Sequence, residues 1–296
     1  MFEEPSGCLL PDGKRFQLRQ GPIDLIIQAF GAHDQIARAY KNAEERFQTI
    51  LINLTKELGY LRTDLRYSID SPKDPVAQRM VEACRAHQDD FVTPMAAVAG
   101  AVADEILDTM IGSADLTKAY VNNGGDIAFY LSRGSKIKTG IVGSLELPKI
   151  NATCEFLYEF SARGIATSGW RGRSYSLGIA DSVTVLAKNA ASADVAATLI
   201  ANNVNVDHAG IVRTPAYELN PDHDLKDRLV TRRVPKLEKV LIWKALDRGQ
   251  TIAQNMLEAG LIDGSFLYLQ EEFRTVGEIP GGKISRPCSS KAQSIK

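Results

Sequence analysis

Hydrophobic and polar residues alternate over residues 14–31, where RFQLR is followed by QGP and then by IDLIIQAFG. This pattern predicts two strands joined by a turn, the second apolar enough to lie inside a sheet. Over residues 36–60 the hydrophobic positions instead recur every three or four residues, which predicts a helix that ends near Gly59. A second helix is predicted to begin near Ser71-Pro72, because a proline in the first helical turn lacks only an amide hydrogen that would have no partner there.

A third helix is predicted over about 94–112, in PMAAVAGAVADEILDTMIG. Its many Ala and Gly residues let another backbone or a ligand approach closely, so we expect it to be buried on most faces. Short segments separated by glycine-containing turns follow it and have the pattern of strands. They are KAYVNN, DIAFYL, KIKTGIV, residues 155–168 and DSVTVLAK at 181–188. The last of them runs directly into a helix, ASADVAATLIANN.

The C-terminal third is predicted to contain a long helix over about 236–259, stopped at Gly260, and a final strand in GSFLYLQ. From Gly277 onward turn-forming residues predominate, which predicts a flexible tail over 277–296. Because strands and helices do not alternate regularly, we expect an α+β fold with a mixed or antiparallel sheet and packed helices. Residues 1–276 are expected to form a single domain, which could have two lobes.

Composition narrows the classes of function. The 296 residues are 44% hydrophobic and 24% charged, as in ordinary globular proteins, and the net charge of −1 argues against a nucleic-acid partner. No run approaches the ~20 apolar residues that span a bilayer, and the acidic start MFEEPSGC lacks a signal-peptide pattern. We therefore expect a cytoplasmic protein without a membrane segment. The four cysteines form no CxxC pattern, so neither a zinc site nor a disulfide framework is indicated.

Two glycine-containing segments are candidates for binding a small phosphate-containing molecule. In YVNNGGDIA, Gly124-Gly125 can adopt positive φ angles and expose amides, although the same pattern is typical of a β-hairpin turn. In GIATSGWRGRSYS, a strand ends in Thr167-Ser168-Gly169, which can present oxygens and amides to a phosphate, while Trp170 offers a stacking face. Arg171 and Arg173 would add positive charge; the alternative interpretation is a polar surface loop.

Asp194 and Thr198 are four residues apart in a predicted helix, so their side chains lie on one face, a turn apart. A carboxylate and a hydroxyl placed in this way can share a hard cation such as Mg²⁺ or Ca²⁺. Spacing alone leaves a second interpretation. In it, Ser192 is the N-cap, Asp194 complements the helix dipole, and Thr198 is merely tolerated in the helix.

The order of these segments resembles the ApbE-like superfamily, whose best-known members are FAD:protein FMN transferases. Four motifs carry the resemblance, which covers about residues 14–205. They are TPMAAVAGAVAD at 93–104, VNNGGDI at 121–127, IATSG at 165–169 and SVTVLAKNAASADVAAT at 182–198. The segments GPIDLIIQAFG and LNPDHDLKDRLVT also resemble a shorter, soluble branch of that superfamily. The resemblance implies an ApbE-like, T-fold-like architecture.

The resemblance also implies a magnesium site and a flavin site. The Mg²⁺ would lie between Asp194, Thr198 and a backbone carbonyl near Ala96. FAD or FMN would be held across the NxGG turn and the TSG strand end, by Asn123, Gly124, Gly125, Asp126, Thr167, Ser168, Gly169 and Arg171. The implied activity is metal-dependent FMN transfer, or cleavage of the FAD pyrophosphate by water, with the cation neutralising charge on the phosphates.

The chain departs from the transferase pattern at several positions. The acid and the lysine of the Ala/Gly segment are replaced by Thr93 and Ala99, and no His-x-x-Asp-Pro-x-x-Gly segment follows the ATSG strand. Two alternatives therefore stand beside FMN transfer. One is an enzyme on the same scaffold that binds a non-flavin anion through Arg171, Arg173 or Arg228. The other is a flavin-binding protein without turnover. The catalytic residues stay unassigned, and the Ala-rich surface and long C-terminal helix could serve a homodimer.

Overall fold

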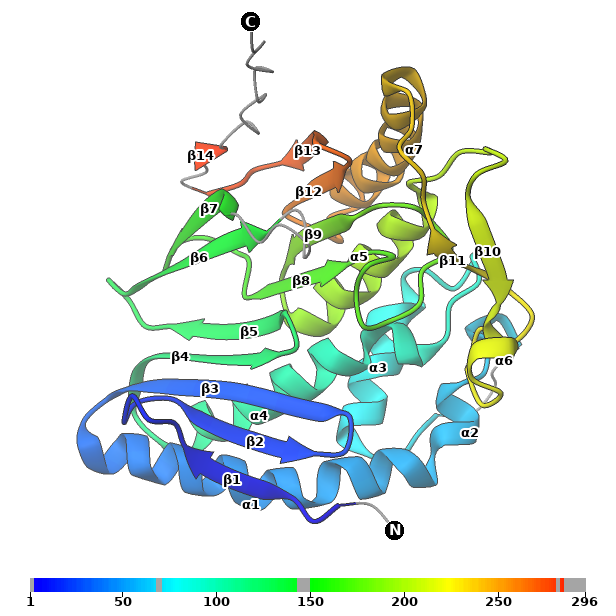
Figure 1. The fold of residues 1–296 in the computed structure, drawn as a ribbon. Coiled ribbons are helices and arrows are strands. Elements are labelled where there is room, and N and C mark those ends of the chain that lie inside the picture. The colour runs from blue at the N-terminus through cyan, green and yellow to red at the C-terminus, as the bar shows by residue number, and fades with distance from the viewer. Residues whose placement is uncertain (1–2, 68–70, 143–149, 281–282, 285–296) are drawn as a thin grey trace, which may run out of the picture.

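A nine-stranded sheet organises the protein (Figure 1), whose computed structural model describes residues 3–67, 71–142, 150–280 and 283–284. Neighbouring strands in this sheet are antiparallel. Their order across the sheet is β1 (Ser6–Leu9), β2 (Phe16–Gln20), β3 (Ile23–Gly31), β4 (Leu116–Asn123), β5 (Asp126–Leu131), β8 (Gly164–Ser168), β9 (Ser182–Ala187), β12 (Gly264–Leu269) and β13 (Glu272–Gly277). The expected α+β fold with an antiparallel sheet is therefore confirmed.

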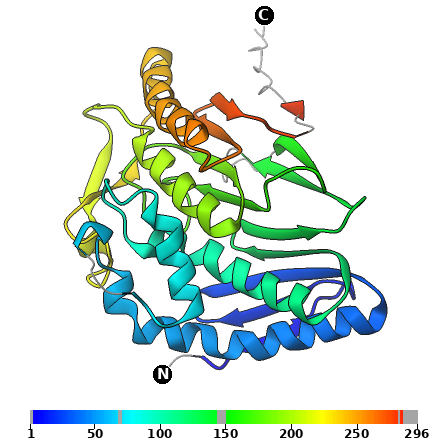
Figure 2. The same cartoon turned by 180° about the vertical axis from the view of Figure 1, so that it is seen from behind.

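The long helices pack on one face of this sheet, as the view from behind shows (Figure 2). They are α1 (His33–Lys56), α3 (Pro75–Arg85), α4 (Val98–Ser113), α5 (Ala190–Asn203) and α7 (Lys239–Glu258). Shorter turns of helix join them: α2 (Leu58–Leu61), α6 (Ala216–Leu219) and the 3₁₀ turns η1 (Leu65–Tyr67) and η2 (Pro94–Ala97). In the part of the chain that the structure describes, no helix is long and apolar enough to cross a bilayer.

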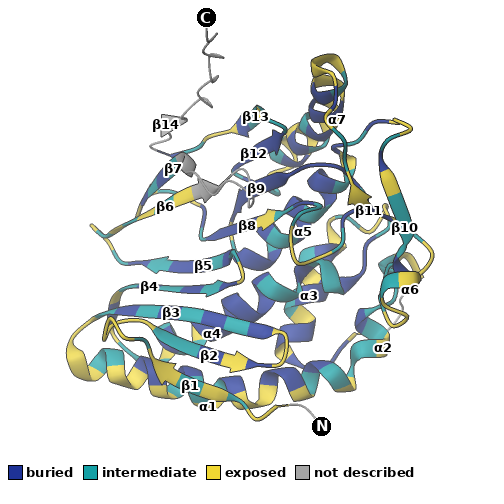
Figure 3. Cartoon of the chain, in the orientation of Figure 1, coloured by how far each residue is buried: buried dark blue, intermediate teal, exposed yellow. Residues whose placement is uncertain are grey.

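A small sheet covers part of the opposite face. Its order is β14 (Lys283–Ile284), β7 (Ile150–Leu157) and β6 (Lys136–Val142), and Phe156 packs against Phe129 and other buried aromatic residues of the large sheet. Consequently β9 and β12 are buried at every position (Figure 3), which is why their sequences lack alternation. A separate two-stranded ribbon is formed by β10 (Val212–Pro215) and β11 (Leu229–Arg233).

The start of α5 is in backbone contact with α4 and β8. A Cβ atom on Gly100 of α4 would lie 2.3 Å from the carbonyl oxygen of Ala190, and one on Gly164 of β8 would lie 2.0 Å from the carbonyl carbon of Asn189. The two carboxylate oxygens of Asp104 in α4 accept the amides of Ala190 and Ala191 at 3.0 and 2.9 Å. Asp104 therefore satisfies amides in the first turn of α5 that have no partner within that helix.

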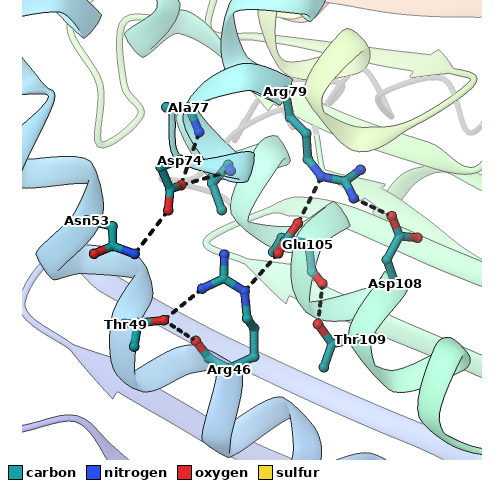
Figure 4. A network of polar contacts seen from close by, with 10 residues as sticks. Arg46, Thr49, Asn53, Asp74, Ala77, Arg79, Glu105, Asp108 and Thr109 are labelled. Carbon is teal, nitrogen blue, oxygen red and sulfur yellow. Dashed lines mark hydrogen bonds and ion pairs between the residues drawn. The ribbon is translucent and has the colours of Figure 1, made fainter. Parts of the chain in front are cut away.

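Ion pairs fasten α1 and α3 to α4 (Figure 4). The buried Glu105 accepts from Arg46 Nε at 2.8 Å and from Arg79 Nε at 3.0 Å, and Arg79 also contacts Asp108. Each carboxylate oxygen of Glu105 has its own guanidinium partner, so its negative charge is compensated. This network sets the position of α4, and α4 carries the segment that the motifs assign to the site.

Several expectations about the elements and their boundaries differ from the structure. The second helix begins at Pro75 with Asp74 as N-cap, because Asp74 Oδ1 accepts the amide of Val76 at 2.9 Å, whereas Ser71-Pro72 precede it. The predicted third helix begins instead as the 3₁₀ turn η2. The single strand over 155–168 is two strands, β7 and β8, separated by a turn. The strand in GSFLYLQ is followed by β13, and β14 lies within the predicted tail, whose residues 285–296 are outside the described part of the chain.

Two glycines of α4 provide a matched test of the backbone contact. Gly100→Ala should destabilise the protein by about 1–3 kcal/mol, since its methyl group would overlap Ala190 and force α5 to move. Gly112 is exposed and has open space at its Cβ position. Gly112→Ala should therefore stabilise by about 0.5–1 kcal/mol. Urea unfolding measures both changes, and equal effects of the two substitutions would contradict the close approach.

Candidate functional site

The turn between β4 and β5 forms one side of the candidate site. Gly124 and Gly125 have φ angles of +66° and +119°, a backbone conformation that other residues rarely adopt. The turn closes a two-residue hairpin in which Asn123 pairs with Asp126, and the amide of Gly125 donates to Asn122 Oδ1 at 2.9 Å. Because the hairpin itself requires these glycines, the pair alone does not demonstrate a ligand site.

The residues on either side of this turn contact other candidate segments. The side-chain amide of Asn123 donates to the carbonyl of Ala99 in α4 at 3.1 Å. Asp126 Oδ1 accepts the amide of Thr167 in β8 at 3.1 Å, and both Asn123 and Asp126 are buried. The glycine turn, the end of β8 and the start of α4 thus meet, which is the clustering that the motif order predicts.

Asp194 reaches this cluster from α5 and caps the neighbouring helix. Its Oδ2 accepts the amide of Gly100 at 3.0 Å, and the amide of Ala99 also donates to the carboxylate. Both amides belong to the first turn of α4, whose own N-cap residue, Ala97, has no side-chain acceptor. Asp194 therefore points toward the positive end of the α4 dipole, where a negative charge is favoured.

Asp126 and Asp194 are two carboxyl groups that share one poorly solvated place. Burial raises the pKa of Asp126 to about 7 from an ordinary value of 3.8. Burial also raises the pKa of Asp194 well above that value, and the charge of Asp126 raises it further. Because each charge disfavours the other, the pair binds a proton or a cation more readily than two separate aspartates would.

Thr198 follows Asp194 on α5, and Ala96 lies in the 3₁₀ turn that precedes α4. Thr198 is partly exposed one turn further along α5, and its hydroxyl has no hydrogen-bond partner among the described residues. Ala96 is in η2, which packs against α5. The alternative that Ser192 caps α5 is wrong, since Asn189 does so with its Oδ1 2.8 Å from the amide of Ser192. The metal-binding role of Asp194, Thr198 and Ala96 remains a prediction.

The residues at the end of β8 and the arginines after it differ in exposure and in the partners they already have. Thr167 is exposed, although its hydroxyl bonds that of Thr184 at 2.9 Å, and the neighbouring Ser168 is partly exposed. Arg171 donates from Nε to Asp181 at 2.8 Å and stacks on Trp170, so its charge already has a partner.

A second arginine lies nearer the glycine turn. Arg173 Nη1 is 3.0 Å from the position of a Cβ on Gly124, whereas Gly169 packs against the carbonyl of Asp181. Of the two arginines, Arg173 is thus the better placed to meet a ligand on the turn.

Sequence reasoning missed Asp104 as part of this arrangement. Burial raises its pKa to about 6, although the amides of Ala191 and Ala190 oppose that rise. An acid in the middle of the apolar run VAGAVADEIL was a usable signal, because a buried carboxylate needs a donor and its own helix offers none.

A family model described as AbpE bacteria matches residues 8–277, which contain the turn, the strand end and both capping aspartates. The chain belongs to this family. A UPF0280 protein of Methanothermobacter thermautotrophicus is 41% identical over 134 residues, 44% of this chain and 49% of that protein. A UPF0280 protein of Methanococcoides burtonii is 33% identical over 209 residues, 67% of this chain and 80% of that protein. The chain thus aligns with about half of the first relative and four fifths of the second.

Two solved structures that align with this chain are ApbE proteins. The flavinyl transferase ApbE of Pseudomonas stutzeri aligns with a TM-score of 0.46 and 11% identity, covering 93% of this chain and 95% of that one. The ApbE protein of Thermotoga maritima aligns with a TM-score of 0.39 and 11% identity, covering 90% and 94%. Membership of the AbpE bacteria family rests on the family model.

The donor atoms present suit a hard cation in this family member. Asp194, Asp126 and Thr198 offer oxygen atoms only, the ligand type that Mg²⁺ prefers, and a cation would relieve the repulsion between the two carboxylates. No three His, Cys, Asp or Glu side chains of the described residues gather as a metal site. A cation here would therefore be held weakly by the protein and would depend on water and ligand phosphates for its remaining bonds.

The raised pKa of Asp126 predicts a pH dependence of stability. The folded protein holds this proton up to about pH 7, whereas the unfolded chain releases it near 3.8, so stability should fall as the pH rises between those values. Asp126→Asn keeps an acceptor for the Thr167 amide and removes the charge. The fall in melting temperature between pH 5 and 8 without metal should be smaller in this variant than in wild type. An unchanged pH profile would contradict the burial of this carboxyl, and Asp115→Asn, on the exposed surface, is the control.

Proposed function

We propose that this protein binds FAD together with a divalent cation and cleaves the phosphoanhydride of FAD. AMP leaves, and the FMN moiety passes to water or to a hydroxyl group. The observation that carries the proposal is the pair formed by the buried Asp126 and the partly buried Asp194, between a glycine turn and the first turn of α4, whose amides Asp194 accepts. A pair of carboxyl groups that resists ionisation alone becomes a binding site when a cation is present.

The cation would be held by Asp194, Thr198 and a carbonyl near Ala96, with Asp126 as a further source of negative charge. Bound there, it supplies Lewis-acid neutralisation of the phosphate oxygens. The backbone amides of Ala99 and Gly100 in the first turn of α4 donate to Asp194 and hold its carboxylate at this place. The chain's own part is to fix these charges in advance, so that little reorganisation is needed as the phosphoanhydride bond breaks.

The diphosphate would lie on the glycine turn. Gly124 and Thr167 are exposed and Gly125 is partly exposed. Arg173 Nη1 approaches Gly124, while its Nη2 donates to the carbonyl of Pro22 at 3.1 Å. An arginine guanidinium is a group that proteins use to hold phosphates. The choice of a flavin over another dinucleotide rests on the motif order, in which NxGG and TSG precede A-D-x-x-A-T.

The arrangement of arginines disfavours the alternative of a non-flavin anion held by an arginine clamp. Arg171 is engaged by Asp181, and Arg228 lies over the ring of Phe91 at 3.4 Å. Of the three arginines considered, only Arg173 approaches the glycine turn. A single arginine beside two carboxylates suits a metal-bound diphosphate better than a bare carboxylate ligand.

Direct measurement on the full chain tests the proposal. Flavin fluorescence should be perturbed when FAD binds, and binding should tighten when Mg²⁺ is added, because the cation links the phosphates to the carboxylates. Incubation of FAD with Mg²⁺ and enzyme should release AMP and FMN, or AMP with FMN attached to protein, which chromatography and mass spectrometry separate. Binding without AMP release would point to a flavin carrier instead, and absence of both binding and products would sink the proposal.

Asp194→Asn probes the metal site with little change of shape. The Asn oxygen can still accept the amide of Gly100, so the fold should persist, while the charge that attracts the cation is lost. We expect AMP release to fall at least about 100-fold, and the Mg²⁺-induced rise in melting temperature at pH 8 to disappear.

The exposed Asp207 gives the matched control, since Asp207→Asn removes one negative charge away from the buried pair. If Asp194→Asn instead lowers the stability without Mg²⁺ and leaves cation binding and AMP release intact, Asp194 serves only as a cap for α4.

A further inference from the structure

Asp181, immediately before β9, connects two other segments of the chain. Its Oδ1 accepts hydrogen bonds from Arg171 Nε at 2.8 Å and from the indole nitrogen of Trp170 at 3.2 Å, and its Oδ2 accepts the backbone amide of Gln270 at 2.7 Å. The side chain of Asp181 is buried. Because each carboxylate oxygen already has a donor, the carboxylate cannot rotate without breaking a bond, and it fixes the donors relative to one another.

Backbone contacts hold the start of the loop at residues 169–177 to the same place. The amide of Trp170 donates to the carbonyl of Ala180 at 3.0 Å, and a Cβ atom on Gly169 would lie 2.5 Å from the carbonyl oxygen of Asp181. The amide of Gly172 donates to the carbonyl of Gly169 at 3.0 Å, which closes a tight turn. The first residues of the loop are therefore held to Asp181 by backbone as well as by side chains.

The 169–177 loop is also held at its other end, and Arg173 lies between the two. Asn202 Oδ1 of α5 accepts the amide of Leu177 at 2.9 Å. Arg173 donates from Nη2 to the carbonyl of Pro22 at 3.1 Å, and its Nη1 lies 3.0 Å from the position that a Cβ on Gly124 would take. Nε and Nη1 of Arg173 have no hydrogen-bond partner among the described residues. The loop thus presents unused donors of Arg173 at the glycine turn.

The third donor to Asp181 comes from a turn with an uncommon backbone. Gln270 and Glu271 join β12 to β13 with φ angles of +45° and +72°, a region that residues other than glycine rarely adopt. The side chain of Gln270 donates from Nε2 to the carbonyl of Pro235 at 2.6 Å and accepts the amide of Leu237 on Oε1 at 2.9 Å. These bonds offset the cost of the backbone conformation in which the amide of Gln270 meets Asp181.

We propose that Asp181 is a positioning residue for binding of the FAD diphosphate, because it holds the 169–177 loop in the conformation that brings Arg173 to the glycine turn; this inference rests on the proposed function. Asp181 engages Arg171 as a structural cation and leaves Arg173 to meet the ligand. A guanidinium already placed by its loop loses little freedom when the diphosphate binds, so the affinity for FAD is higher than with a mobile loop.

A double-mutant cycle tests whether Asp181 acts through Arg173. Arg173→Gln should raise the dissociation constant for FAD with Mg²⁺ about tenfold, since the guanidinium is lost. Asp181→Asn should raise it about five- to tenfold. An Asn side chain has a single oxygen acceptor, so its NH₂ group faces either the amide of Gln270 or the donors of the loop, and that contact is lost. The double variant should match Arg173→Gln within about twofold, because the residue that Asp181 positions is already absent.

Two exposed residues provide matched controls for the lost charges. Asp207→Asn removes an acid, and Arg133→Gln removes an arginine that follows the end of β5 distant from the glycine turn. Both should bind FAD as wild type does. If Asp181→Asn does not fold, Arg171→Gln replaces it in the cycle, since it breaks the same contact from the loop side. Its effect should likewise vanish in the Arg173→Gln background, whereas an arginine that itself touches FAD would keep its effect there.

The indole of Trp170 reports the state of the loop without any ligand. The chain has two tryptophans, so Trp243→Phe leaves Trp170 as the source of the only indole N–H signal in proton–nitrogen NMR. Asp181→Asn should shift this signal and speed its exchange with solvent, because the acceptor of the indole is changed. Arg173→Gln should leave the signal in place. An indole signal that Asp181→Asn does not move would overturn the proposal.

The outcomes separate the two proposals. If wild type binds and cleaves FAD but Asp181→Asn or Arg173→Gln binds it equally well, or if their effects on the dissociation constant multiply in the double variant, the role of Asp181 is overturned while the proposed function stands. If wild type neither binds nor cleaves FAD, the proposed function fails, and the role of Asp181 in diphosphate binding fails with it.

Discussion

The first turns of α4 and α5 are each completed by a carboxylate from the other helix. Asp104 of α4 accepts two amides of α5, and Asp194 of α5 accepts amides of α4. This exchange is possible only because Gly100 lets the two backbones touch. Two helices joined in this way behave as one unit, and the sheet, the Glu105 network and η2 are built around that unit. The arrangement also brings Asp194 close to Asp104 and to Asp126, whose charges both raise its pKa, and this is unfavourable unless something offsets those charges.

The repulsion between these carboxylates links the stability of the fold to the proposed binding of a cation. Asp126 and Asp194 hold protons more tightly than ordinary aspartates because burial and mutual repulsion penalise ionisation. A cation bound only by the folded state would replace those protons and would stabilise the fold by mass action. The same charges that weaken the empty protein at higher pH are thus the charges that would attract a metal-bound diphosphate. Asp194 thus serves both the fold, as the cap of α4, and the proposed cation site.

Much of the fold follows from periodicity, because an amphipathic helix such as α1 and the alternating β2 and β3 have one buried face each. Alternation does not identify β9 and β12, because both faces of these strands are buried. Over residues 155–168 the apolar pattern predicts one strand where the structure has two. The candidate site was predictable only as a set of segments. Spacing placed Asp194 and Thr198 on one helix face, yet nothing local indicates that Asp194 caps α4. Likewise the hydroxyl of Thr93 meets its acceptor, Asp224, only through the fold.

The close contact of two glycines with the start of α5 limits which substitutions the sequence of this protein can accept. A Cβ atom on Gly100 would overlap the backbone of Ala190, and one on Gly164 would overlap the backbone of Asn189. Residue size at those two positions is a steric requirement that is independent of any substrate. The rim, by contrast, consists of exposed groups such as Thr167 and Arg173, which bear little of the packing. Related proteins could therefore differ in ligand preference through the exposed residues at the rim while the two packed glycines stay the same.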